Sequence, residues 1–309
     1  MATSRQAATS GYVRIVAAAT VWGSIALLVR ATDAHPAVIV FWRVSFAALA
    51  IGAYLAVRGR LGELGALPRR TQIAIAGTGA LLSLNWVLFL SALTLTKVAV
   101  AVLLGYLGPV FVAALNPIVS RQPFDRRIVV PLVLALMGTA IIVGPQDLAL
   151  DEGRHLLGAG LAFASSLTYA VLIVVVKRLL EGVPASTYML GEYMVASIIL
   201  LPAALLLSGP AGAVEWGALA TLGIVHTAFT GALFLTGLRL VPADRAAILT
   251  YAEPVSAVAF AAIFLGERAR MTTLLGGTCV LVAGMIVARL APAQTATVEG
   301  PPVPVTATD

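Results

Sequence analysis

The sequence predicts an all-α polytopic membrane protein whose ten transmembrane helices form two inverted five-helix repeats. Sixty per cent of the 309 residues are hydrophobic and only 11% are charged, with a mean hydropathy of +0.99. Soluble proteins carry about 25% charged residues, so the natural solvent of this chain is the bilayer. The second observation is an internal repeat, in which residues 88–110 recur 145 positions later.

The spans are recognised as long apolar runs. A helix needs about 20 mostly apolar residues to cross a bilayer, and the chain contains ten such runs, most of them uncharged inside. The runs do not alternate between apolar and polar residues, which argues against outer-membrane strands. The expected spans are 12–30, 36–57, 72–92, 98–119, 128–145, 156–177, 187–208, 215–238, 243–265 and 271–290.

The distribution of basic residues predicts the orientation. With the N-terminus inside, fourteen of the twenty lysines and arginines fall in inside segments and five fall outside, while Arg43 lies within a span. Inside loops are enriched in Lys and Arg, so both termini are expected in the cytoplasm and the chain in the inner membrane. The net charge of +6 is spread between the spans, so no nucleic-acid partner is expected.

The repeat is carried by scarce residues. Ten of 23 positions match between 88–110 and 233–255, including Tyr106 with Tyr251 and Pro109 with Pro254. Because five spans is an odd number, the second half must enter the membrane from the opposite side, as in many secondary transporters. Each proline is expected to kink its helix, either as a packing feature or to line a site.

The expected organisation has five parts. These are a cytoplasmic tail at 1–11, a first repeat at 12–145, an outside linker at 146–155, a second repeat at 156–290 and a disordered cytoplasmic tail at 291–309. The segment at 291–309 is rich in proline and threonine and shows no periodic pattern of apolar residues, which predicts disorder.

Four short motifs stand out along the chain: TVWGS (Trp22-Gly23), FWR (Arg43), TYAEPV with LGER (Glu253, Pro254, Gly266, Glu267) and GGTCVLVAGMIVAR. In these motifs the sequence resembles the drug/metabolite transporter superfamily, in its bacterial ten-helix EamA branch. This resemblance implies a carrier, often an exporter, of small metabolites such as amino acids or of toxic compounds, with a central cavity and no ATPase domain. The first half departs from the second, with Gly108 where Glu253 stands.

Four ionisable residues within the spans are candidates for coupling or charge recognition. Such residues are costly in a bilayer and are functional hypotheses by default. Glu253 beside Pro254 could exchange a proton with either side, or could be a structural acid. For Arg43, Glu192 and His226 we favour structural roles, although Arg43 could contact a substrate carboxylate and His226 could titrate near neutral pH.

Aromatic and amide side chains deep in the spans are candidates for the substrate cavity. Tyr and Trp offer an apolar face and one polar group, which suits a partly oily ligand. Packing is the alternative role for each, and we favour it for Trp86. The candidates are Trp22, Asn85, Trp86, Tyr106, Tyr169 and Tyr251.

No sequence motif indicates catalysis or a cofactor. Nucleotide-binding, zinc-protease and serine-hydrolase signatures are absent, and one cysteine with three scattered histidines predicts no metal site. We therefore expect a secondary transporter of a small molecule, driven by substrate or proton gradients, as a monomer or homodimer. The alternatives are a membrane-embedded enzyme acting on lipid-like substrates, a non-transporting scaffold and a channel.

Overall fold

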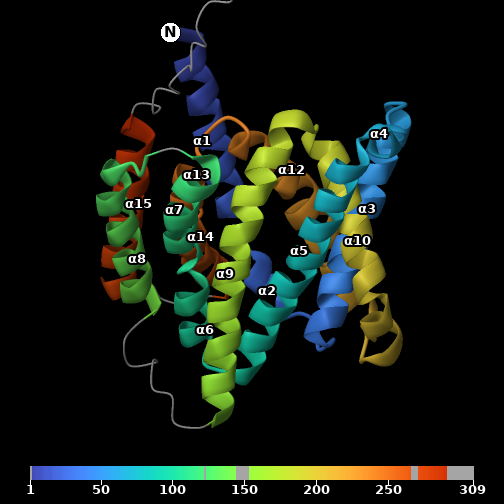
Figure 1. The fold of residues 1–309 in the computed structure, drawn as a ribbon. Helices are drawn as coiled ribbons and strands as arrows, with labels where there is room; N and C mark the ends of the chain where they lie inside the picture. The colour runs from blue at the N-terminus through green and yellow to red at the C-terminus, as the bar shows by residue number, and fades with distance from the viewer. Residues whose placement is uncertain (1, 122, 144–152, 266–270, 291–309) are drawn as a thin grey trace, which may run out of the picture.

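A computed structural model describes residues 2–121, 123–143, 153–265 and 271–290. All regular elements in these ranges are helical (Figure 1). The first half contains α1 (Ala2–Trp22), α2 (Ile25–Val29), α3 (Pro36–Val57), α4 (Glu63–Ala66), α5 (Arg69–Leu95), α6 (Val98–Gly105), α7 (Gly108–Ser120), η1 (Arg126–Ile128) and α8 (Val129–Val143). The second half contains α9 (Gly153–Gly182), α10 (Ala185–Leu206), α11 (Ala213–Thr221), the π-helix η3 (Leu222–Phe229), α12 (Thr230–Leu238), α13 (Ala243–Leu249), α14 (Ala252–Leu265) and α15 (Met271–Arg289).

Each expected span corresponds to one helix or to one helix in consecutive pieces. Within the described residues, eight helical stretches are long and apolar enough to cross a membrane. The two remaining spans are the shorter helices α8 and α15, which pack against each other along their lengths (Figure 1). At their contact a Cβ on Gly138 would lie 2.6 Å from the Gly276 carbonyl oxygen, so both helices need glycine there. The fold is all-α and polytopic, as predicted.

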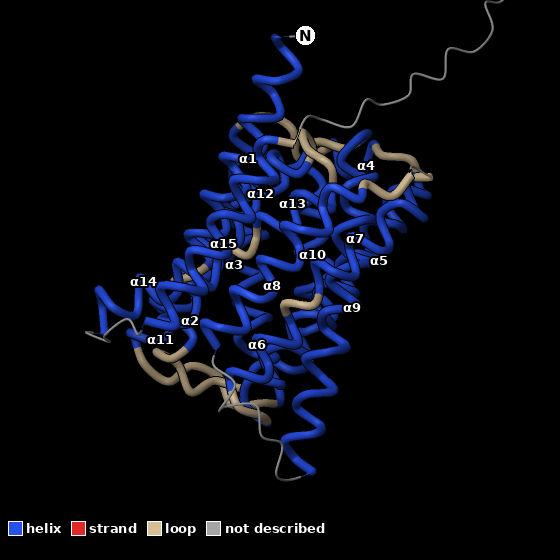
Figure 2. The backbone as a smooth tube through the Cα atoms, turned by 90° about the vertical axis from the view of Figure 1, so that its left-hand side faces the viewer, coloured by secondary structure: helices blue, strands red, loops and turns tan. Residues whose placement is uncertain are grey.

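The two halves are arranged as inverted repeats. Helices α6 and α13 begin equivalent spans, and they lie toward opposite ends of the bundle (Figures 1 and 2). The contacts obey the same symmetry. In the first half α5 and α7 pack against α9, the first helix of the second half, while α12 and α14 pack against α1, the first helix of the first half. The equivalent helices α3 and α10 also pack against one another.

The core of the bundle and its outer face differ as expected for a bilayer. Large side chains such as Tyr188, Leu219 and Tyr251 are fully buried. Apolar side chains such as Leu206 and Ile263 are 81% and 72% exposed. Exposed apolar surface of this extent is unfavourable in water but suits contact with lipid.

Three sequence predictions lie outside the described residues. They concern the disordered tail at 291–309, most of the linker at 146–155 and the LGER segment with Gly266 and Glu267.

Candidate functional site

The repeated tyrosines lie at two helix breaks and contact each other. One break separates α6 from α7 at Tyr106, and the other separates α13 from α14 at Tyr251. Their rings stack with centroids 5.7 Å apart and planes 27° apart, and the Tyr251 hydroxyl donates to the Tyr106 carbonyl at 2.6 Å. Pro109 and Pro254 each lie in the first turn of the following helix, where a missing N–H costs little. The two repeats therefore meet through their equivalent breaks.

Glu253 lies in the first turn of α14, beside this tyrosine pair. Its side chain is half-buried and interacts with the Tyr106 side chain and, electrostatically, with Arg43. A helix N-terminus favours a carboxylate. At the equivalent position of the first half, a Cβ on Gly108 would lie 2.6 Å from Tyr169 Cδ1. The Tyr169 ring therefore occupies the space that a Gly108 side chain would need, and the site has one acid rather than two.

Arg43 reaches from α3 toward α5, η3 and α14. Its guanidinium carbon lies 3.9 Å from the centroid of the Trp86 ring, and its Nε donates to Thr227 Oγ1 at 2.7 Å. Cation–π contact with Trp is favourable where water is scarce. A Cβ on Gly223 would lie 2.8 Å from the Arg43 carbonyl oxygen, so this glycine allows η3 to approach α3 closely.

His226 joins the π-helix η3 to the break between α1 and α2. Its Nε2 lies 2.8 Å from Ser24 Oγ, and the Trp22 indole N–H donates to its carbonyl at 2.9 Å. Thr227 in η3 and Thr230, the first residue of α12, donate to carbonyls five residues earlier in η3, at 2.8 Å each. π-Helical turns are rare in proteins, and those that occur are often found at functional sites.

The glycine of the TVWGS motif brings the first span against α14. A Cβ on Gly23 would lie 2.6 Å from the Ala257 backbone nitrogen and 2.9 Å from the Glu253 carbonyl oxygen. Trp22 also packs against Phe234, with ring centroids 5.1 Å apart. The motif thus places Trp22 and Ser24 beside His226 and Glu253.

Asn85 and Tyr169 lie on the facing helices α5 and α9. Asn85 is buried, and its Nδ2 donates to the Ser165 carbonyl at 2.6 Å and to Thr168 Oγ1 at 2.9 Å. These bonds tie α5 to α9, which is a packing role. Tyr169 is half-buried and interacts with Thr250 at the α13–α14 break.

Glu192 lies apart from this group. It is buried on α10 and accepts a hydrogen bond from the Tyr188 hydroxyl one turn earlier. The structure therefore brings together Trp22, Arg43, Trp86, Tyr106, Tyr169, His226, Tyr251 and Glu253, which we call the central cluster, and leaves Asn85 and Glu192 beside it. Thr227 and Ser24 also belong to the arrangement, and sequence reasoning missed them because short hydroxyl side chains are common in membrane helices.

Sequence reasoning also missed an ionic contact between the halves. Arg245 at the start of α13 is 1% exposed; among its contacts are Asp125 Oδ2 at 3.1 Å, Tyr12 Oη at 3.2 Å and the Leu290 carbonyl at 2.8 Å. Asp125 precedes η1 and also accepts hydrogen bonds from Arg127. The Arg127 guanidinium, with help from Arg245, lowers the pKa of Asp125 to about 2. A count of basic residues treats Arg245 as an ordinary loop charge, whereas it is buried.

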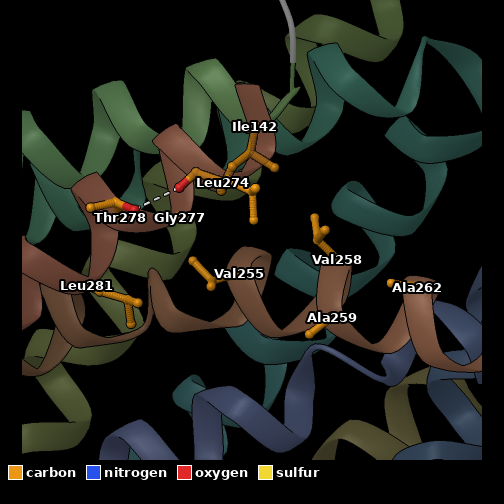
Figure 3. Close-up of a pocket in the computed structure, with 9 residues that line it drawn as sticks. All are labelled: Ile142, Val255, Val258, Ala259, Ala262, Leu274, Gly277, Thr278 and Leu281. Carbon is orange, nitrogen blue, oxygen red and sulfur yellow. Dashed lines mark hydrogen bonds between the residues drawn. The ribbon is translucent and has the colours of Figure 1, made fainter. Parts of the chain in front are cut away.

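A crevice of about 270 Å³ lies between α14, α15 and α8 (Figure 3). Its lining is almost wholly aliphatic, and its one hydroxyl, on Thr278, donates to the Leu274 carbonyl at 2.8 Å. No member of the central cluster lines it. The crevice therefore offers no polar recognition, and the central cluster is the better candidate for a substrate site.

Comparison with known proteins identifies the family. The EamA-like transporter family matches twice, at residues 9–144 and 156–289. The chain belongs to this family. It is therefore a membrane transporter rather than an enzyme, and each EamA match covers one of its two repeats.

Individual relatives agree with this assignment. An uncharacterized transporter of Archaeoglobus fulgidus is 28% identical over 278 residues, which cover 90% of this chain and 96% of that protein. The uncharacterized transporter YxxF of Bacillus subtilis is 26% identical over 290 residues, covering 91% and 90%. A solved crystal structure superposes with a TM-score of 0.78 at 19% identity, covering 90% of this chain and 97% of the other. At that identity the superposition supports the fold alone.

Proposed function

We propose that this EamA family member is a secondary active transporter of the inner membrane that exports small metabolites, such as amino acids or related compounds, or drugs. Both termini would lie in the cytoplasm. The repeats at 12–145 and 156–290 would rock against each other, so that the central cluster faces one side of the membrane at a time. Inverted repeats permit this exchange because each half can adopt the conformation of the other.

The observation that carries the proposal is the contact between Tyr106 and Tyr251. Both residues lie at helix breaks, and broken helices at membrane depth are tolerated only against protein or a wet cavity. Arg43 and Glu253, two charged groups that are costly in a membrane, lie around the same contact. Broken helices and charges at the meeting point of two repeats are typical of a transported-substrate site.

Glu253 is our candidate for proton coupling. Its carboxylate lies beside the Tyr106 side chain and interacts with Arg43 across a site shared by both repeats. A carboxyl group that changes its solvent exposure as the repeats rock would take up a proton on one side and release it on the other. Arg43, His226 and Glu253 are the members of the cluster that carry or can carry charge.

The test is counterflow in proteoliposomes. Purified protein would be reconstituted into vesicles loaded with a panel of amino acids and small amphiphilic drugs, and the uptake of a labelled external compound would be followed. A transporter gives saturable exchange that vanishes in vesicles without protein. Absence of exchange across the panel, from protein that elutes as a single folded species, would contradict the proposed substrate range.

A further inference from the structure

The guanidinium of Arg43 is held in place but has unused donors. Its Nε donates to Thr227 and its face lies on Trp86, while its two terminal nitrogens donate to no side chain or carbonyl in the described part of the chain. Arg43 also forms no ion pair with a described carboxylate, although it interacts with Glu253 at longer range. The side chain is half-buried, so these donors are not sealed by protein.

The position of this unused donor pair is fixed from three directions. Thr227 holds Nε, the Trp86 ring supports one face, and Gly223 sets the distance between α3 and η3. Thr227 is itself fixed, because its hydroxyl donates to the Leu222 carbonyl at 2.8 Å. A guanidinium held in this way binds an anion with little further loss of side-chain entropy.

We propose that Arg43 binds a carboxylate of the transported compound through its two terminal nitrogens, so that the substrates are carboxylate-bearing organic compounds. This inference rests on the proposed transport function and adds the substrate class. A planar carboxylate has two oxygens that match two parallel N–H donors of a guanidinium.

The charges around Arg43 favour a carboxylate over a phosphate. The Glu253 carboxyl group lies near the same space, and the other titratable side chains among the described residues that interact with Arg43 from neighbouring elements are Tyr193 and His226. Arg43 supplies a single positive charge, so a ligand with one negative charge leaves less excess negative charge beside Glu253 than a ligand with two. A phosphate monoester of charge near −2 would keep an excess negative charge close to Glu253, which is unfavourable at low dielectric.

The experiment is a binding assay, which does not require transport. Trp86 lies against Arg43, so intrinsic tryptophan fluorescence and melting temperature of the purified protein would be followed during titration. The probes are two acid–amide pairs, leucine with leucinamide and phenylacetate with phenylacetamide, together with phenyl phosphate. We expect at least one acid to bind about 10- to 100-fold more tightly than its amide, as for hydrogen bonds to a charged group, and phenyl phosphate to bind weakly.

Variants of Arg43 distinguish a role in binding the ligand carboxylate from a purely structural role. Arg43→Gln should abolish the preference for acid over amide. Arg43→Lys should retain part of this preference, since lysine keeps the positive charge but lacks the two parallel N–H donors of the guanidinium. Arg58→Gln is the matched control, because Arg58 ends the same helix with its guanidinium 5.5 Å from the Tyr54 ring, away from the cluster. If Arg43→Gln fails to fold, Thr227→Val keeps the charge, frees the guanidinium and should reduce the preference.

Three results would overturn the proposal. They are an unchanged acid preference in folded Arg43→Gln, equal binding of acids and amides by the natural protein, and no binding of either acid at millimolar concentration. A protein that exchanges substrates in vesicles yet gives one of these results remains a transporter, so the failure of this inference is distinct from the failure of the proposed function.

Discussion

The Tyr251 hydroxyl donates a hydrogen bond to the backbone carbonyl of Tyr106, its own counterpart in the first repeat. That carbonyl is available because the helix is interrupted. The Val110 N–H, which would reach it in a continuous helix, bonds instead to the Leu107 carbonyl at 2.9 Å. The reverse contact is not made, since the Tyr106 side chain interacts with Glu253. The two equivalent tyrosines therefore have different roles. The Tyr251 hydroxyl donates to a backbone carbonyl, whereas the Tyr106 side chain interacts with the Glu253 carboxyl group.

Loss of the Tyr251 hydroxyl should destabilise the protein. Tyr251→Phe keeps the stacked ring but leaves the Tyr106 carbonyl without this donor at a buried site, which costs about 1–3 kcal/mol. We expect a lower melting temperature in detergent for Tyr251→Phe. Tyr54→Phe is the matched control, because Tyr54 is 45% exposed and its hydroxyl makes no hydrogen bond among the described residues; an equal loss in both variants would contradict the assignment.

Neutralising Glu253 should uncouple transport from the proton gradient. Glu253→Gln keeps the size and hydrogen-bonding capacity of the side chain but cannot release a proton. We expect counterflow to persist, because exchange needs no net proton movement, while gradient-driven uptake and its dependence on pH are lost. Glu192→Gln serves as control, since Glu192 lies apart with Tyr188. Unchanged gradient-driven uptake in Glu253→Gln would exclude the coupling role.

The sequence predicted the helices well and the side-chain contacts less well. The span at 36–57 coincides with α3 because both its ends carry local signals, Pro36 at the first turn and polar residues after Val57. The offset of 145 predicted the equivalence of Tyr106 and Tyr251, since scarce residues kept the register. Their contact, the partners of Arg43 and the burial of Arg245 depend on how helices far apart in the chain pack together. A hydropathy pattern does not contain that information.

Gly23 should be intolerant of even a methyl group. A Cβ added at this position would lie 2.6 Å from the backbone nitrogen of Ala257, and backbone cannot move aside as a flexible side chain can. We expect Gly23→Ala to lower the melting temperature and to reduce transport, because α1 must shift away from α14. In Gly77→Ala, the matched control, the new methyl meets nothing within 4 Å in the middle of helix α5. That change should be neutral or slightly stabilising, by up to about 1 kcal/mol.

The contact between Asp125 and Arg245 should stabilise the protein at all ordinary pH values. Because the folded-state pKa of Asp125 is lowered to about 2, its stabilising contribution is complete above the ordinary value near 3.8 and is lost as the pH falls through about 2. The pair should therefore add no pH dependence between about pH 5 and 8.

Asp125→Asn should lower the melting temperature throughout that range, because the buried Arg245 loses its ion pair with the Asp125 carboxylate. Breaking a fully buried pair costs about 3–5 kcal/mol, and we expect a smaller loss because Asp125 is 16% exposed. Arg127→Gln is the control, since Arg127 is 53% exposed and such pairs are worth about 0–1 kcal/mol. The charge exchange Asp125→Arg with Arg245→Asp should recover part of the loss. A melting temperature that matches the natural protein in Asp125→Asn would show that the other contacts of Arg245 suffice.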